Sequence, residues 1–246
     1  MEVSKIVNPA TKIGRKVLNL MLKKCGAVIV AAGSASRMGG KDKIMENLGG
    51  EPLIVKTVKA FQRCDAVSEI VIVTREDLMV KIMGLVRGMS KVKAVVAGGK
   101  ERSESVNLGL NALSADVKLA AVHDGARPLV TWQLIDRVVR AAHAYGAAAP
   151  GVPVKDTVKV VAGGVVKNTP DRNTLRAIQT PQVFDFDLLR AALKQARADG
   201  AAITDDCSAV ERMGMSVKLV DGDERNMKVT TPMDLEIVRL LWEEQA

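Results

Sequence analysis

The sequence predicts an α/β protein with a mainly parallel, mixed sheet that helices cover on both faces. Short apolar runs alternate with amphipathic helical patterns along most of the 246 residues, an order typical of right-handed strand-helix-strand crossovers. Hydrophobic residues make up 48% of the chain and aromatic residues only 2%. A core built of Val, Leu, Ile, Ala and Met favours a buried parallel sheet over a sandwich of two sheets.

The first half of the chain contains alternating strands and helices. The strands are expected where β-branched and small apolar residues run continuously, at 27–32, 69–74, 93–98 and 118–123. Helical patterns occupy 52–63, 76–88, 102–113 and 131–145. Pro52 suits a first helical turn, and Thr131 is expected to cap its helix.

The second half adds a hairpin. Two short strands at 154–168 flank Gly163-Gly164, a signal for a hairpin turn. We expect an inserted arm at about 154–172 within one domain of residues 26–246, because no repeat or linker divides this part of the chain. Residues 1–25 are expected to be a basic N-terminal extension. Further helices are expected at 185–198, near 205–213 and from 231, and a strand at 216–220.

Composition argues against several classes of protein. The net charge is +8, of which residues 1–24 carry +5. Nucleic-acid binding is not expected, because the chain has too few aromatic residues among its basic ones to stack on bases. No apolar stretch is long enough to span a membrane, and the three cysteines lack the spacing of a zinc or disulfide site. We therefore expect a cytoplasmic protein with neither a membrane nor a nucleic-acid partner.

The loop after the first strand, GSASRMGGKDK at 33–43, combines glycines with three cations, Arg37, Lys41 and Lys43. Its glycine spacing matches neither the dinucleotide pattern GxGxxG nor the P-loop. Backbone amides, a guanidinium and ammonium groups are nonetheless suited to binding a polyphosphate. The alternative is a surface loop whose charges are merely solvated.

Two further loops are expected at the same edge, because the carboxyl ends of parallel strands meet there. In AGGKERSESV, Ser105 either bonds to the polar edge of a base or caps the following helix. In HDGARP, Asp124 either holds a ribose hydroxyl or a magnesium ion, or pairs with Arg127 to fix the loop. His123 is expected to pack and orient this loop, not to act as a base.

Two late segments add charged residues. Adjacent acids in TDDCSAVE are compatible with a metal site, but Thr204-Asp205 also fits a helix cap, which we favour. Lys228 stands alone before a turn with Pro232. By itself it indicates no function.

Seven segments together resemble, in order and spacing, the 2-C-methyl-D-erythritol 4-phosphate cytidylyltransferases of the non-mevalonate isoprenoid pathway. The resemblance runs from about residue 26 to the end, and it implies a Rossmann-like three-layer sandwich. One departure is Ala35, where the family often has a glycine. The segments are AAGSASRMGGKDK, GGKERSESV, VHDGARP, PVKDTVK, DRNTLRAIQTPQVF, TDDCSAVE and NMKVTTPMDL.

The resemblance implies that CTP and methylerythritol 4-phosphate give the CDP-alcohol and pyrophosphate. The substrate phosphate would attack the α-phosphorus in line, and because a phosphate monoester is already nucleophilic at neutral pH, no general base is needed. Catalysis would then rest on positioning and charge stabilisation. Magnesium would be held mainly by the CTP phosphates, with no metal ligands from the protein.

The family's cationic residues carry over to matching positions. Arg37 and Lys43 would hold the triphosphate and stabilise the pentacoordinate phosphorus, with Lys228 assisting. Thr157 and Arg172, on the hairpin arm, would reach the methylerythritol phosphate of a neighbouring subunit. The resemblance therefore implies a homodimer with composite sites.

The nucleotide and the second substrate would contact further residues. Asp124 and Gly125 would face the ribose and the second substrate, which Arg127 would also contact. The cytosine would be bound by Gly99, Lys100 and Ser105, in a pocket lined by Ala31, Ala32 and Gly33.

Two alternatives remain open. A ribitol-5-phosphate cytidylyltransferase shares the fold and most motifs, although HDGARP and DRNTLRAIQTPQ look more like the methylerythritol enzymes. A non-catalytic nucleotide-binding protein would share the fold alone. Such a binder should have lost at least one of Arg37, Lys43, Arg172 and Lys228, all of which are present.

Overall fold

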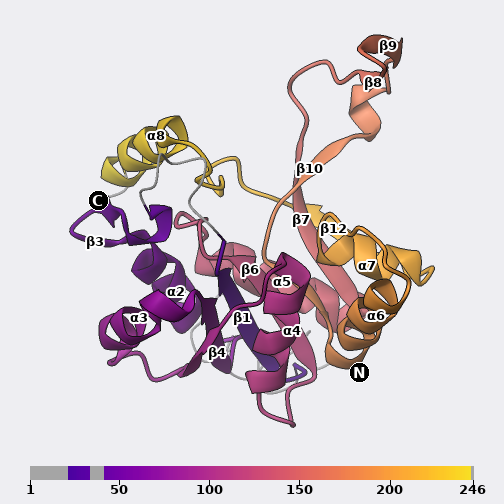
Figure 1. Cartoon of the computed structure of the whole chain (residues 1–246). Coiled ribbons are helices and arrows are strands. Elements are labelled where there is room, and N and C mark those ends of the chain that lie inside the picture. The colour runs from indigo at the N-terminus through magenta and orange to yellow at the C-terminus, as the bar shows by residue number, and fades with distance from the viewer. Residues whose placement is uncertain (1–21, 34–41, 245–246) are drawn as a thin grey trace, which may run out of the picture.

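A computed structural model describes residues 22–33 and 42–244, which form a mixed sheet between helices (Figure 1). Central strands run parallel, in the order β6, β1, β4 and β5. Their positions confirm the four predicted strands to within one or two residues. They are β1 (Cys25–Ala31), β4 (Glu69–Thr74), β5 (Val92–Ala97) and β6 (Leu119–Asp124).

The other side of the sheet was only partly predicted. The expected strand at 216–220 lies at 218–221 and pairs in parallel with a strand of sequence AAAPGVP. The sequence pattern did not predict that strand, because it contains three alanines and two prolines. A proline lacks the backbone N–H that would donate to a neighbouring strand. An antiparallel strand, β11, joins this strand to β6, and a second antiparallel strand, β10, pairs with its residues 151–153. These strands are β7 (Ala147–Pro153), β10 (Arg176–Ile178), β11 (Gln182–Asp185) and β12 (Lys218–Asp221).

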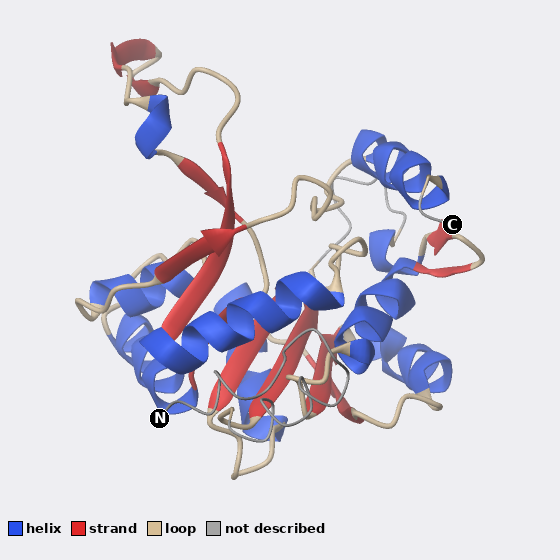
Figure 2. Ribbon diagram, turned by 180° about the vertical axis from the view of Figure 1, so that it is seen from behind, coloured by secondary structure: helices blue, strands red, loops and turns tan. Residues whose placement is uncertain are grey.

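Helices cover both faces, so the three-layer α/β class is confirmed (Figure 2). Side chains alternate along β1: Ala27 and Ile29 face one apolar core, and Val28 faces the other. The first core includes residues of α2 (Leu53–Arg63), α3 (Met79–Val86) and α5 (Trp132–Tyr145). The second includes residues of α4 (Arg102–Ala112), α6 (Phe186–Ala198) and α7 (Asp206–Arg212).

Helix starts follow local capping chemistry. Thr131 accepts a hydrogen bond from the Leu134 N–H, as predicted. Asp205 caps α7 through the Ser208 N–H, so the cap favoured for TDD is confirmed. Pro52 occupies the N-cap of α2, one residue before the expected first turn. The predicted helix at 76–88 is divided, because a 3-10 turn (Glu76–Leu78) precedes α3.

The hairpin arm stands clear of the sheet and helices in both views (Figures 1 and 2). Its strands are confined to 160–168, within the expected 154–168, and turn at Gly163 and Gly164, both of which have positive φ. A 3-10 turn, η5 (Arg172–Thr174), lies between the second strand of the arm and β10, where the chain returns to the sheet. The arm strands are β8 (Val160–Ala162) and β9 (Val165–Asn168).

The C-terminal helix covers a third apolar cluster beside the carboxyl edge of the sheet. This helix, α8 (Pro232–Glu243), packs against the segment that follows β1. That segment contains η3 (Lys43–Met45), β2 (Asn47–Leu48) and β3 (Glu51–Pro52). Within the described ranges, the structure has no helix long and apolar enough to cross a lipid bilayer.

Candidate active site

A cavity of about 290 Å³ opens where β1, β6 and the loop after β5 end. It brings together residues of the three loops expected at this edge of the sheet, and it adds Lys228 from the other end of the chain. A larger, open groove of about 1150 Å³ between α4 and α6 shares only Lys100 with the predicted site. Predicted residues that line the smaller cavity are Ala31, Ala32, Gly33, Lys43, Gly99, Lys100, Ser105, Asp124 and Lys228.

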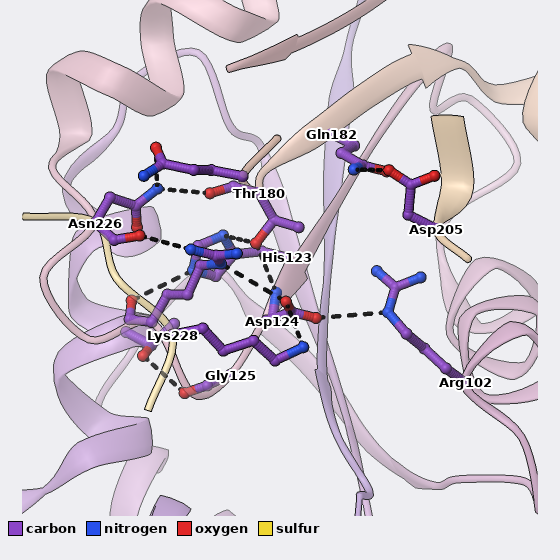
Figure 3. Close-up of polar contacts among 12 residues, drawn as sticks. Arg102, His123, Asp124, Gly125, Thr180, Gln182, Asp205, Asn226 and Lys228 are labelled. Atoms are coloured by element: carbon purple, nitrogen blue, oxygen red, sulfur yellow. Dashed lines mark hydrogen bonds and ion pairs between the residues drawn. The ribbon is translucent and has the colours of Figure 1, made fainter. Parts of the chain in front are cut away.

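Asp124 lies at the centre of the cations in this cavity (Figure 3). Its carboxylate is 2.9 Å from Lys228 Nζ, 3.5 Å from Arg102 Nε and 3.6 Å from Arg127 Nε. Burial alone would raise the pKa of Asp124, but the charges of Lys228 and Arg102 outweigh burial and hold it well below its usual range. The carboxylate is therefore ionised and already paired, so the expected Asp-Arg pair is present as part of a larger cluster.

Arg102 is the site residue that the sequence interpretation missed. It lines the cavity and also pairs with the fully buried Asp206, 2.8 Å away on α7. Its only sequence signal is an arginine directly after the GGKE loop, and nothing local indicates its partner. The second acid of TDD thus serves as a buried counter-ion, while the first caps the helix.

Side-chain hydrogen bonds fix the loop after β5. The N–H of Gly99 donates to Ser105 Oγ at 3.1 Å, and the N–H of Lys100 donates to Glu104 Oε2 at 2.9 Å. Ser105 Oγ in turn donates to the Glu101 carbonyl at 3.1 Å. A side chain at Gly99 would collide with Glu104. The loop is thus held in one shape, and these two amides are already satisfied within it.

His123 is a packing residue, as predicted. Its ring is fully buried, with its centroid 4.9 Å from that of Phe61. Thr180 Oγ1 accepts from the Asp124 N–H and lies 3.1 Å from His123 Nδ1, so the hydroxyl donates to that nitrogen. The Nε2–H then faces the Arg127 carbonyl at 3.4 Å. Burial lowers the pKa of His123 to about 3, against the opposing charge of Asp124.

Replacing His123 with glutamine is expected to flatten the pH dependence of stability. The folded protein keeps the imidazole neutral, whereas the unfolded chain binds a proton below the ordinary pKa of 6.5. Stability should therefore fall as pH falls, by about 2 kcal/mol between pH 6.5 and about pH 5. Denaturant unfolding at both pH values measures this slope.

His143→Gln provides the matched control, because it replaces the other histidine of the chain. It should leave the slope in place. An unchanged slope in His123→Gln would contradict the assignment of the pH dependence to this buried ring.

Other predicted residues lie outside the cavity lining. The Gly125 N–H donates to the Val30 carbonyl, and Arg127 donates to the Asn226 carbonyl at 2.6 Å, so both fix the loop. Thr157 and Arg172 are exposed and do not line the cavity of their own chain; they belong to the arm, which stands clear of the sheet in Figure 1. Arg37, Lys41, Ala35 and nearly all of the N-terminal extension lie outside the described residues.

A family model described as IspD: 2-C-methyl-D-erythritol 4-phosphate cytidylyltransferase matches residues 25–244. The chain belongs to this family. As an IspD family member it is a cytidylyltransferase of the non-mevalonate isoprenoid pathway, as the resemblance implied.

Individual relatives agree over nearly the whole length. The chain is 46% identical over 221 residues to the 2-C-methyl-D-erythritol 4-phosphate cytidylyltransferase of Symbiobacterium thermophilum, covering 89% of this chain and 93% of that protein. It is 43% identical over 224 residues to that of Caldanaerobacter subterraneus subsp. tengcongensis, covering 87% and 96%. The crystal structure of 4-diphosphocytidyl-2C-methyl-D-erythritol synthase from Anaerococcus prevotii superposes with a TM-score of 0.83 at 28% identity, covering 93% of this chain and 99% of that one.

Proposed function

We propose that the cavity around Asp124 transfers the cytidylyl group of CTP to 2-C-methyl-D-erythritol 4-phosphate. The observation that carries this proposal is the convergence of Lys43 and Lys228, from opposite ends of the chain, on one cavity with the loop of Gly99. A phosphate oxygen of the second substrate forms a bond to the α-phosphorus of CTP. The bond from that phosphorus to the bridging oxygen breaks, and pyrophosphate leaves with the electron pair.

Cationic side chains stabilise the charge that spreads over the transferring phosphoryl group. Lys43 follows the glycine-containing loop, whereas Lys228 comes from the segment before α8 and is held by Asp124 at 2.9 Å. Arg37, by resemblance, completes the set. Asp124 pairs with three cations. Its carboxylate orients Lys228 and offsets the repulsion among the three positive charges.

Cytosine is recognised through the rigid loop after β5. The amides of Gly99 and Lys100 are engaged by Ser105 and Glu104, so at these two residues the carbonyl oxygens are left for a base. A carbonyl accepts from the amino group of cytosine and opposes the oxygen of uracil. We therefore assign the preference for CTP over UTP to these carbonyls, with Ala31, Ala32 and Gly33 lining the base pocket.

In this proposal, magnesium binds to the protein together with CTP. Within the described residues, no group of three or more His, Cys, Asp or Glu side chains has the arrangement of a metal site. Asp124, the carboxylate among the predicted site residues, is already neutralised by cations. The residues that the structure describes therefore do not fit a resident magnesium ion, and the phosphates of CTP are its natural ligands.

The arm has an exposed apolar surface that is suited to packing against a second subunit. It exposes Val160, Val161, Val165 and Val166, each more than two-fifths accessible, in a hairpin that has no core of its own. A two-stranded hairpin with exposed apolar side chains is stabilised by packing on another surface. We propose a homodimer in which Thr157 and Arg172 bind the methylerythritol phosphate in the neighbour's site.

Arg172→Ala is expected to raise KM for the alcohol phosphate by about tenfold or more, the cost of losing one hydrogen bond to a charged group. KM for CTP should change far less, because the nucleotide pocket lies in the body of the protein. Steady-state kinetics with each substrate varied in turn measure both values. Arg176→Ala is the control, because Arg176 is an exposed arginine of β10, just beyond the arm. Equal effects of Arg172→Ala on the two KM values would count against the assignment.

Pyrophosphate release tests the reaction itself. Purified protein with MgCl₂ and CTP receives methylerythritol 4-phosphate in one sample and ribitol 5-phosphate in another, with ATP, GTP and UTP as nucleotide controls. Release with CTP and methylerythritol 4-phosphate alone is expected. Release only with ribitol 5-phosphate would identify the ribitol enzyme, and CTP binding with no release would identify a non-catalytic protein.

The three cysteines are buried free thiols, which fits a reducing compartment, and we propose a cytoplasmic location.

A further inference from the structure

Helix α8 connects the segments that carry the two catalytic lysines. The small apolar cluster beneath it contains Leu48, five residues after Lys43, and Val229, the residue after Lys228. Leu129, just beyond the Asp124 loop, joins the same cluster. The helix supplies Leu235 and Val238, and Leu241 and Trp242 pack against the cluster. No residue of this cluster lines the cavity.

At its C-terminal end, α8 holds the turn that follows η3. Arg239 Nη2 lies 3.4 Å from the Glu46 carboxylate, and its Nε donates to the Asn47 carbonyl at 3.4 Å. The indole of Trp242 lies directly against Gly49, where an added Cβ would collide with the ring. Lys56 Nζ stands 4.4 Å from the centroid of the same ring.

The same helix is tied to the Lys228 segment. Arg225 donates to the Leu241 carbonyl at 3.0 Å, so the chain before Lys228 is joined to the end of α8. The Val229 N–H donates to the Ala126 carbonyl at 2.9 Å, which joins the chain after Lys228 to the Asp124 loop. Hydrogen bonds therefore hold the chain on both sides of Lys228.

The Lys43 side also depends on α8. Strands β2 and β3 contain two residues each, and η3 contains three. Such short elements are not stable alone, so packing decides where they lie. Part of that packing comes from the first core, which includes Ile44 of η3. Part comes from the contacts of Glu46, Asn47 and Gly49 with α8.

We infer that Trp242 and Arg239 are positioning residues for the transfer reaction: they set the turn at residues 46–49 and thereby place Lys43 relative to Lys228. This inference rests on the proposed roles of the two lysines. A displacement of about 1 Å of a group that acts on the transition state costs up to about 100-fold in rate. The effect of disturbing either residue should therefore appear in kcat.

Two adjacent glycines provide the test. Gly49 and Gly50 both have positive φ, at 55° and 82°, but only Gly49 contacts Trp242, whereas a Cβ at Gly50 meets nothing within 4 Å. Gly49→Ala and Gly50→Ala therefore share a backbone penalty and differ in the clash. We expect Gly49→Ala to lower kcat by about 10-fold to 100-fold, and Gly50→Ala to change it less than about threefold. KM for methylerythritol 4-phosphate should stay within about twofold in both, because the arm is not part of this contact.

A double-mutant cycle with Lys43→Ala shows whether the effect passes through that lysine. If it does, Gly49→Ala should lower kcat by less than about threefold in the Lys43→Ala background, because coupled sites are not additive. Independent, multiplicative losses would overturn the inference. So would equal kcat values for Gly49→Ala and Gly50→Ala.

A second variant covers the case in which Gly49→Ala does not fold, as judged by its thermal transition. Arg239→Met removes the contacts with Glu46 and Asn47 from a partly exposed position and leaves the apolar cluster whole. We expect it to lower kcat by about threefold to tenfold, and an unchanged kcat would overturn the inference. Wild-type pyrophosphate release, measured in the same assay, tests the proposed function separately.

Discussion

Asp124→Ala is expected to lower the free energy of unfolding by about 3–5 kcal/mol and to abolish turnover. The carboxylate is nearly buried and balances Arg102, Arg127 and Lys228. Removing it takes this anion away from Arg127, whose side chain is 11% exposed, and from the partly exposed Lys228, and losing the partner of a nearly buried charge costs more than the loss of an ordinary contact. Denaturant unfolding at pH 7 and pyrophosphate release measure the two effects.

The pH dependence follows from the same cluster. Because the folded-state pKa of Asp124 is depressed, its contribution to stability is fully present above the unfolded value of 3.8 and is lost as pH falls below it. Stability near pH 3 should therefore differ less between Asp124→Ala and the wild type than at pH 7. A constant difference at both pH values would contradict the assignment of the loss to charge.

Asp187→Ala provides a matched control for the stability measurement. Asp187 pairs with Arg190 at 3.0 Å, but three-quarters of its side chain is exposed to solvent. Exposed pairs contribute about 0–1 kcal/mol, so this variant should unfold almost like the wild type. If Asp124→Ala costs no more than Asp187→Ala, Asp124 is not the anion that holds the cluster together.

Lys43→Ala is expected to lower kcat by about 100-fold or more, the loss typical of removing one electrostatic donor from a transition state. Lys43 lines the cavity, as do Gly99 and Lys100, and a compact ammonium there is suited to approach a triphosphate. KM for the alcohol phosphate should change little, because Arg172 and Thr157 are assigned to that substrate. Steady-state kinetics with saturating CTP measure the change.

Lys81→Ala is the control for a general loss of positive charge. Lys81 is an exposed lysine of α3, outside the cavity lining. We expect its kcat to match the wild type. A comparable fall in both variants would show that net charge, and not the position of Lys43, governs the rate.

Local patterns were sufficient for much of the fold. The run EIVIVT was predicted at 69–74 and forms β4 over the same residues, because a continuous β-branched run is stable only as a buried strand. Caps at Thr131 and Asp205 were also predictable, since each depends on a side chain and an amide three residues away. Strand β7 was missed because its alanines and prolines become a strand only between partners distant in sequence.

The sequence by itself determined the family, the α/β class and the loops that end at the carboxyl edge, because motifs, periodicity and capping are properties of short segments. Only the tertiary structure decided what surrounds Asp124. Arg102 approaches it from α4 and Lys228 from the segment before α8, and Asp206, 104 positions from Arg102, completes the buried charge balance. Such pairings arise when strands and helices pack, since charges buried together must neutralise one another wherever they lie in the chain.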